Sequence, residues 1–296
     1  MENLIDRIAI DKASALVEAL GYIQRFHNKV VVVKVGGSIM DDEQALTNLL
    51  NDIVFMNYVG MQPVLIHGGG KAISDAMLKA GLEPQMVQGR RYTDERTLAI
   101  AEHVLCDQIN KYIVTYIQAQ GCEAMGLHAL SSNVLFAEKT YLNGADGRRI
   151  DLGLVGEVKS VNSRLLQLLV QADSIPCIAS IAMDDSGGRL NVNADTAAGA
   201  VAAAMKAEKL VVISDTHGIR SRPDDPSSTV THLTVAQIEQ LVQSGVINSG
   251  MLPKVEACIL ALRGGVNKTH IIDGRIPHAL LLEIYTEAGI GTEIVL

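Results

Sequence analysis

Short apolar runs that alternate with segments of helical periodicity limit most strongly what this chain can fold into. From residue 29 onward the apolar runs have strand length, and the segments between them are long enough for helices. This alternation predicts βαβ units around a parallel sheet that helices cover on both faces. We expect strands at 29–35, 63–66, 123–128, 175–180, 189–192, 209–214, 269–272 and 291–295, and helices at 42–59, 70–80, 94–119, 162–171, 194–206, 234–243, 252–262 and 278–286.

Two segments depart from the alternation. The stretch TYLNGADGRRIDLGLVGEV (140–158) contains Asn-Gly and Asp-Gly pairs, which mark the tip of a hairpin. Ahead of the first strand, apolar residues recur at helical spacing from Ile5 to Phe26, so we expect one or two amphipathic helices there. Such a helix packs either on its own domain or on another subunit.

Composition excludes several classes of function. The 33 acidic and 25 basic residues give a formal charge of −8 without a basic tract, so no nucleic acid partner is expected. The four cysteines lie far apart, without the spacing of a metal site or a redox pair. No charge-free apolar run reaches membrane-spanning length, and the first residues lack a signal-peptide pattern. We therefore expect a cytoplasmic protein with no membrane contact.

Two glycine-rich turns each follow an apolar run: VVVKVGGSIM (31–40) and PVLIHGGGKAISDAM (63–77). Glycines let the backbone approach a ligand closely, and a helix N-terminus favours negative charge. Neither segment is the G-x-x-x-x-G-K-[ST] of a P-loop or the G-x-G-x-x-G of a dinucleotide site. Either turn alone could be only a turn, but the pair, one of them carrying Lys34, indicates an anion site.

Polar groups also gather at the starts of two later helices. Asn191, Asn193 and Asp195 precede an alanine-rich helix, where Asp195 is either a helix cap or a functional group. Lys254 follows Pro253 in the first turn of a helix. A lysine that enters a helix is normally a solvated surface residue, but the helix dipole gives a cation no help at that end, so a functional reason for its position stays open as the alternative.

Together these motifs resemble the amino acid kinase family. The matching stretches, which cover nearly all of residues 29–296, are KVVVVKVGGS, VLIHGGGKAIS, GRRYTDERTL, LGLVGEV, LNVNADTAAGAVAAAM, GMLPKVEA, HIIDGRIPHALLLE and GIGTEIV. They are most similar to the members that phosphorylate the side-chain carboxylate of N-acetyl-L-glutamate in arginine biosynthesis. The resemblance implies a three-layer αβα sandwich with a mainly parallel open central sheet. It also implies an N-terminal helix (1–28), a lobe for N-acetylglutamate and dimerisation (29–185) and a lobe for ATP (186–296).

The resemblance further implies roles for single residues. Asp195 would hold two lysines in place, and the nucleotide and its transferring phosphoryl group would contact Lys34, Gly36, Gly37 and Lys254. The acceptor would contact Gly69, Gly70, Arg91, Asn191 and Asn193, with Arg91 rather than its neighbour Arg90 clamping the carboxylate that does not react. Magnesium would arrive with ATP, and no metal site of the protein itself is expected.

A regulatory layer is implied in the same way. An N-terminal helix is a feature of the arginine-inhibited members, which are homodimers assembled as trimers of dimers. The residues at the positions that bind L-arginine in that group are Tyr22, Lys209, His270, Glu283 and Gly289. The alternative is that Tyr22 and His270 are core residues and Glu283 is solvated. A PII-type signalling protein is a further candidate partner.

Two departures and two rival functions remain. His217 in SDTHGI and the hairpin at 140–149 differ from the family pattern, and they bear on nucleotide contacts and on a lid over the acceptor. A kinase for carrier-linked aminoadipate would favour a basic entrance, which this acidic chain lacks. A non-catalytic amino-acid sensor would have lost the phosphoryl-handling groups, but Lys34, Asp195 and Lys254 are all present.

Overall fold

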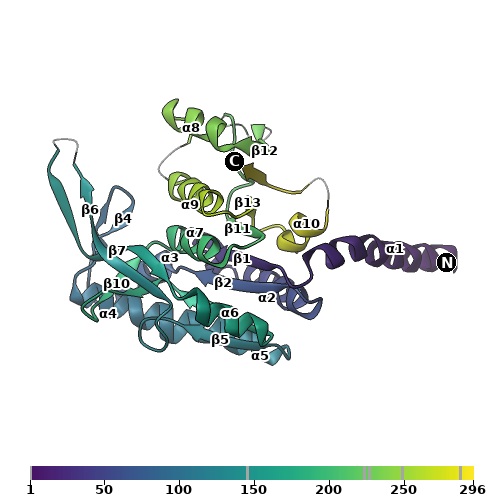
Figure 1. The fold of residues 1–296 in the computed structure, drawn as a ribbon, viewed down its shortest axis with the longest axis horizontal. Coiled ribbons are helices and arrows are strands. Elements are labelled where there is room, and N and C mark those ends of the chain that lie inside the picture. The colour runs from purple at the N-terminus through teal and green to yellow at the C-terminus, as the bar shows by residue number, and fades with distance from the viewer. Residues whose placement is uncertain (1, 145–146, 223–224, 226–227, 248–249, 287–288) are drawn as a thin grey trace.

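A mainly parallel sheet forms the centre of the molecule (Figure 1). The computed structural model describes residues 2–144, 147–222, 225, 228–247, 250–286 and 289–296. In the sheet order, the strands are β12 (His232–Thr234), β14 (Thr292–Val295), β13 (Lys268–Asp273), β11 (Lys209–Ser214), β1 (Val30–Val35), β2 (Gln62–His67), β8 (Ser174–Ala179) and β5 (Glu123–Leu127). Only the β13–β14 pair among these neighbours is antiparallel.

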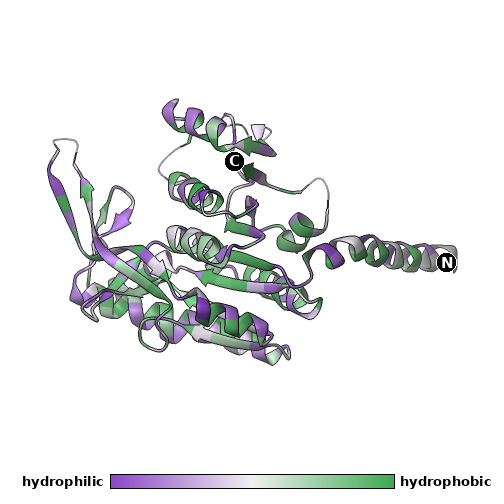
Figure 2. Ribbon diagram, in the orientation of Figure 1, coloured by the Kyte–Doolittle hydropathy of each residue, from purple (hydrophilic) through white to green (hydrophobic). Residues whose placement is uncertain are grey.

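Helices cover both faces of this sheet, because successive residues of each buried strand point to opposite sides. Val32 in β1 belongs to a core with α6 (Ser163–Gln171), α7 (Ala194–Met205), α8 (Val235–Gln243) and α9 (Leu252–Arg263). Its neighbour Val33 belongs to a core with α2 (Glu43–Tyr58), α5 (Lys111–Ala119) and α10 (Ala279–Tyr285). Figure 2 shows the apolar residues concentrated in the central strands and the helices beside them. The predicted three-layer α/β fold is confirmed.

A smaller sheet lies beside the central one. Its strands β6 (Leu135–Asn143), β7 (Arg149–Val161), β9 (Ile181–Met183) and β10 (Arg189–Val192) pair in a closed ring. The hairpin of β6 and β7 projects from the body (Figure 1), as expected for 140–149, although residues 145–146 at its tip lie outside the described part. The turn at 184–188 joins β9 to β10, and the proposed lobe boundary after residue 185 stays a prediction.

The expected helix at 94–119 contains a π-helical segment. The structure has α4 (Glu95–Glu102), the π segment η2 (His103–Asn110) and α5 in one unbroken helical run. Apolar periodicity cannot reveal one locally widened turn. The sequence also did not predict the short 3-10 helix η1 (Gly37–Asp41) or the two-residue strands β3 (Met86–Val87) and β4 (Arg90–Arg91).

The N-terminal segment forms a single helix, α1 (Glu2–Phe26), which extends away from the body (Figure 1). Its last turn packs on the domain through Phe26, whereas Ile10, Leu16, Val17 and Leu20 are exposed large apolar residues. None of the helices in the described part of the chain combines the length and the hydropathy needed to cross a membrane.

Candidate active site

The candidate site lies at the carboxyl ends of the central strands, at the point where the strand order reverses beside β1. From β1 the chain continues to β2 on one side, and β11 lies on the other side of β1. Ligands of open α/β sheets bind outside such a switch point. A cavity of about 270 Å³ lies there. Its lining includes all ten residues predicted for the acceptor and the phosphoryl group: Lys34, Gly36, Gly37, Gly69, Gly70, Arg91, Asn191, Asn193, Asp195 and Lys254.

Asp195 bridges two lysines that come from different elements. Its Oδ1 lies 2.7 Å from Nζ of Lys34 in β1, and its Oδ2 lies 3.6 Å from Nζ of Lys254 in α9. Burial alone would raise the pKa of Asp195, but the two lysines outweigh it and hold that pKa below its ordinary value. The carboxylate is therefore ionised, and the alternative that Asp195 is only a helix cap is wrong, because the cap of α7 is Asn193.

The glycines leave space that a side chain would fill. A Cβ at Gly36 would lie 2.6 Å from Nζ of Lys34, so a side chain there would displace the lysine. A Cβ at Gly69 would lie 2.6 Å from Ile109 Cδ1. Gly37 has φ of +64°, a conformation that favours glycine. Backbone N–H groups can thus face the cavity without side chains between them and a ligand.

Two helix N-termini border the same cavity. α3 (Gly70–Lys79) begins at Gly70 without a side-chain cap, so the N–H groups of its first turn remain available to an anion. At α7, Oδ1 of Asn193 accepts hydrogen bonds from Asp195 N at 2.8 Å and Thr196 N at 3.1 Å. The amide nitrogen of Asn193 is then left for a ligand. Asn191 donates to Thr93 Oγ1 at 3.3 Å.

Arg91 is buried and held by fixed partners. Its Nη2 donates to Gly70 O and to Ser74 Oγ, both at 2.7 Å, and its Nη1 lies 3.3 Å from Met77 Sδ. Burial lowers the pKa of Arg91, yet a guanidinium keeps its charge in proteins. Arg90 also lines the cavity, so location alone does not distinguish the two. The fixed orientation of Arg91 favours it as the carboxylate clamp.

A second cavity, of about 310 Å³, adjoins the first and shares Lys254 with it. Its lining includes Ser214, which ends β11, then Asp215 and Thr216, which follow that strand, and Met251 ahead of α9. Sequence reasoning missed these residues, although a polar run after a buried strand was a usable signal. Asp215 also approaches the first cavity, because its Oδ2 lies 4.0 Å from where a Cβ of Gly37 would be.

His217 does not line this second cavity. Its Nδ1 lies 3.1 Å from Oδ2 of Asp273, which also binds Arg275 at 2.7 Å. In the described residues, His, Cys, Asp and Glu side chains form no group of three that could hold a metal ion. The two adjoining cavities and their shared Lys254 provide space and positive charge for a phosphorylated ligand.

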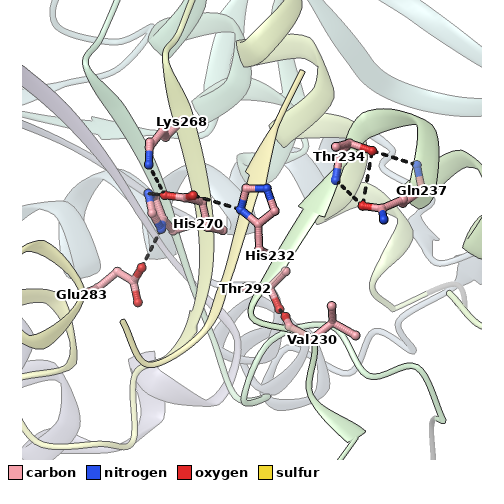
Figure 3. A network of polar contacts seen from close by, with 9 residues as sticks. Val230, His232, Thr234, Gln237, Lys268, His270, Glu283 and Thr292 are labelled. Carbon is pink, nitrogen blue, oxygen red and sulfur yellow. Dashed lines mark hydrogen bonds and ion pairs between the residues drawn. The ribbon is translucent and has the colours of Figure 1, made fainter. Parts of the chain in front are cut away.

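A third cavity, of about 420 Å³, lies between the end of α1 and the first residues of strands β11 and β13. Its lining includes all five residues predicted for L-arginine, Tyr22, Lys209, His270, Glu283 and Gly289, together with the unpredicted Arg25, Lys268 and Glu293. Figure 3 shows the polar contacts beside it.

Glu283 is buried in this cavity wall, so the alternative of a solvated side chain is wrong. Its Oε1 lies 2.6 Å from His270 Nδ1, and its Oε2 accepts a hydrogen bond from Ile290 N at 2.8 Å. Burial would raise the pKa of Glu283, but these partners and Lys209 hold it below its ordinary value. The cavity thus combines an ionised carboxylate with Lys209, whose Nζ lies 5.3 Å from the centroid of the Phe26 ring.

Comparison with known proteins places the chain in a class of phosphoryl-transfer enzymes. Residues 29–273 match the model of the amino acid kinase family, and the chain belongs to that family. It is 44% identical over 292 residues to the acetylglutamate kinase of Symbiobacterium thermophilum, covering 98% of this chain and 100% of the relative. Within the family, the chain belongs to the acetylglutamate kinases, and the resemblance read from the motifs is confirmed.

Two solved structures share the fold of this chain. The N-acetylglutamate synthase of Neisseria gonorrhoeae, in complex with coenzyme A and N-acetylglutamate, matches with a TM-score of 0.84 at 25% identity. The match covers 96% of this chain and 63% of the synthase. The same synthase in complex with coenzyme A and L-arginine matches with a TM-score of 0.79 at 25% identity, covering 96% of this chain and 65% of that one.

Proposed function

We infer that the chain catalyses ATP-dependent phosphorylation of the side-chain carboxylate of N-acetyl-L-glutamate in arginine biosynthesis, and we place this reaction in the cytoplasm. The product is N-acetyl-L-glutamyl 5-phosphate. The observation that carries the inference is the bridge from Lys34 through Asp195 to Lys254, which spans the junction of two adjoining cavities. The family and the named relative support the same reaction.

The acceptor needs no general base, because a carboxylate is already ionised at neutral pH. One of its oxygens forms the new bond to the γ-phosphorus, the bond from that phosphorus to the bridging oxygen breaks, and ADP leaves. The barrier arises from bringing one anion to another, so positioning and charge stabilisation dominate. Lys34 would stabilise the transferring group, and Lys254 would stabilise the charge on the nucleotide side. Magnesium brought with ATP would neutralise further phosphate charge.

The remaining cavity residues would orient the acceptor. Beyond the N–H groups that bind Gly70, Ser74 and Met77, Arg91 keeps Nε–H and one Nη1–H, and its fixed positive charge suits the carboxylate that does not react. Gly69 and Gly70 would border the acceptor and also direct backbone N–H groups at the phosphoryl group that it receives, with the N-terminus of α3 adding favourable potential. Asn191 and Asn193 would contact the acetylated amino acid.

The direct test is ADP release from ATP and magnesium with three acceptors compared side by side: N-acetylglutamate, glutamate and aminoadipate. We expect turnover confined to N-acetylglutamate. Turnover with aminoadipate at the same efficiency would favour the related kinase. No turnover with any acceptor would favour the amino-acid sensor.

We propose further that L-arginine inhibits the enzyme from the third cavity. The support is chemical: the cavity pairs a buried ionised Glu283, suited to a guanidinium, with Lys209 and Arg25, suited to a carboxylate. The synthase solved with L-arginine supports the proposal by likeness.

We also propose that the chain forms homodimers that assemble as a trimer of dimers through α1. The exposed apolar residues of α1 support this, because isolated helices rarely keep such a surface in water. The end of α1 contributes Tyr22 and Arg25 to the third cavity, so assembly and inhibition would be linked. A PII-type signalling protein stays a candidate partner.

A further inference from the structure

A buried histidine and asparagine make contact behind the glycine turn of the active-site cavity. His67 ends β2, and Asn110 ends the π segment η2. Both side chains are buried, and neither lines the cavity. Nδ2 of Asn110 lies 2.9 Å from Nε2 of His67 and also 2.9 Å from the carbonyl oxygen of Cys177 in β8.

These distances determine which nitrogen of the His67 imidazole carries the proton. A carbonyl oxygen only accepts hydrogen bonds, so the group that faces Cys177 must be the NH2 of Asn110. The second hydrogen of that NH2 points to Nε2 of His67, which must therefore be the unprotonated nitrogen. The proton lies on Nδ1, which is 3.3 Å from the carbonyl oxygen of Gly68 and donates to it.

The imidazole also stays neutral. Burial lowers the pKa of His67 to about 4, and the charge of His128 acts in the same direction. The hydrogen bond to Gly68 raises this pKa but does not outweigh burial. Burial likewise lowers the pKa of His128 and raises that of the Cys177 thiol to about 12. His67 thus keeps one tautomer and adds no charge beside the phosphoryl site.

Two independent features of the chain make room for this contact. The π segment ends at Asn110, and π segments are rare features that often mark functional sites. Gly126 in β5 faces the same amide, where a Cβ would lie 2.2 Å from Asn110 Oδ1. Replacing two buried hydrogen-bonding side chains by apolar ones of the same shape can be nearly neutral for stability. Stability alone therefore gives little reason for this arrangement.

We propose that Asn110 and His67 are positioning residues for the glycine turn. Asn110 holds the imidazole so that Nδ1–H fixes the Gly68 carbonyl, and this sets the direction of the N–H groups of Gly69 and Gly70 toward the phosphoryl group. Three successive glycines have wide backbone freedom, and an anion site needs its donors fixed in advance. The inference rests on the proposed kinase function, but one of its tests does not.

The first test is the tautomer of His67 in the unmodified protein. A ¹⁵N-edited NMR spectrum of histidine-labelled enzyme at neutral pH should show the His67 ring protonated at Nδ1 and bare at Nε2. A proton on Nε2, or an imidazolium, would overturn the inference. This measurement needs no substrate and no variant that must fold.

The second test is kinetic and uses Asn110→Asp, with Asn51→Asp as the matched control. Asn51 is a half-buried amide that accepts from Tyr116 at 2.9 Å, far along α2 from the turn, so the same change there should leave kcat within twofold. At position 110 the carboxylate accepts from Nε2–H, so neutral His67 presents a bare Nδ1 to the Gly68 carbonyl. We expect kcat to fall roughly 10- to 100-fold with little change in KM, since small misplacements cost rates of this order.

The pH profile separates positioning from a merely structural role. The new carboxylate raises the pKa of His67, and the imidazolium carries both N–H groups, so it again donates to Gly68. The kcat of Asn110→Asp should therefore recover as pH falls, whereas the pH profile of the unmodified enzyme should show no such rise. Gly126→Ala, which displaces Asn110 without adding a charge, should lower kcat without this recovery at low pH.

Unmodified enzyme that turns over N-acetylglutamate while Asn110→Asp keeps its kcat and pH profile would overturn this inference alone. No turnover by the unmodified enzyme would remove the kinase proposal and with it the positioning role.

Discussion

The ammonium of Lys34, near the end of β1, lies 2.7 Å from Oδ1 of Asp195 in the first turn of α7. The side chain of Lys34 is only 6% exposed, so its charge is held at one point of the cavity rather than spread over many rotamers. Oδ2 of the same carboxylate faces Lys254, and one acid therefore positions two cations. A pre-oriented charge costs little reorganisation at the moment when negative charge develops on the transferring group.

Lys34→Met should lower kcat by about 100- to 1,000-fold, the cost of losing one such stabilising donor. ADP release at saturating ATP and N-acetylglutamate measures it. Lys71→Met is the matched control, because Lys71 is 64% exposed in the first turn of α3 and forms surface ion pairs with Asp41 and Asp75. A loss under tenfold for Lys34→Met, or an equal loss for the control, would contradict this role.

Arg91→Lys should raise KM for N-acetylglutamate by roughly 10- to 100-fold, the range for a lost hydrogen bond between charged groups. A lysine has three donors, so it cannot bind Gly70 and Ser74 and still offer two further N–H groups to the acceptor, whereas the five donors of an arginine allow both. Arg90→Lys is the matched control at the neighbouring position and should change KM for N-acetylglutamate by less than about threefold. If Arg90→Lys has the larger effect, the clamp is assigned to the wrong arginine.

Local patterns explain why much of this site could be predicted from the sequence. Strand, glycine turn and helix follow one another within about 15 residues around Lys34 and again around Gly69, so their geometry is encoded locally. The alternation of strands and helices then brings the carboxyl ends of β1 and β2 together. Lys254 was singled out because a cation in the first turn of a helix is electrostatically unfavourable there.

Contacts between distant segments could not be predicted in the same way. His67 and Asn110 are 43 positions apart, and the widened turn that joins them leaves no mark in apolar periodicity. Asp215 follows a predicted strand, but only the tertiary fold brings its carboxylate near Gly37. The strands β3 and β4 have two residues each, which is too short for an alternating pattern.

Glu283→Gln should abolish inhibition by L-arginine while turnover without arginine stays within twofold. Glutamine has nearly the same shape and still accepts from Ile290 N, but it lacks the charge that would bind a guanidinium. The arginine concentration for half inhibition should rise more than tenfold. Glu239→Gln, which breaks an exposed pair with Arg263, is the control. Unchanged inhibition in Glu283→Gln would remove the third cavity as the arginine site.

His67 should make the folded protein less stable below neutral pH. Its pKa is about 4 when folded and 6.5 as the ordinary value, so between those values the unfolded chain binds the extra proton. The stability contributed by neutral His67 is complete above pH 6.5 and is lost as pH falls toward 4. From pH 7 to pH 5 this amounts to about 2 kcal/mol. Urea unfolding of the unmodified protein and of His67→Gln should differ by that amount in their pH dependence, whereas exposed His103→Gln should match the unmodified protein.

Assembly through α1 should depend on its exposed apolar residues. Leu16 is 70% exposed and Leu20 is 50% exposed, and their spacing of four places them on one face of the helix. Burying such side chains in an interface contributes about 1.5 to 3 kcal/mol each, and glutamine keeps helix propensity while removing that gain. Leu16→Gln with Leu20→Gln should therefore reduce the mass measured by light scattering from six chains to two. Glu18→Gln, which changes an exposed residue on the opposite face of the same helix, should keep six. An unmodified protein with the mass of two chains, or a double variant that keeps six, would show that α1 does not join the dimers.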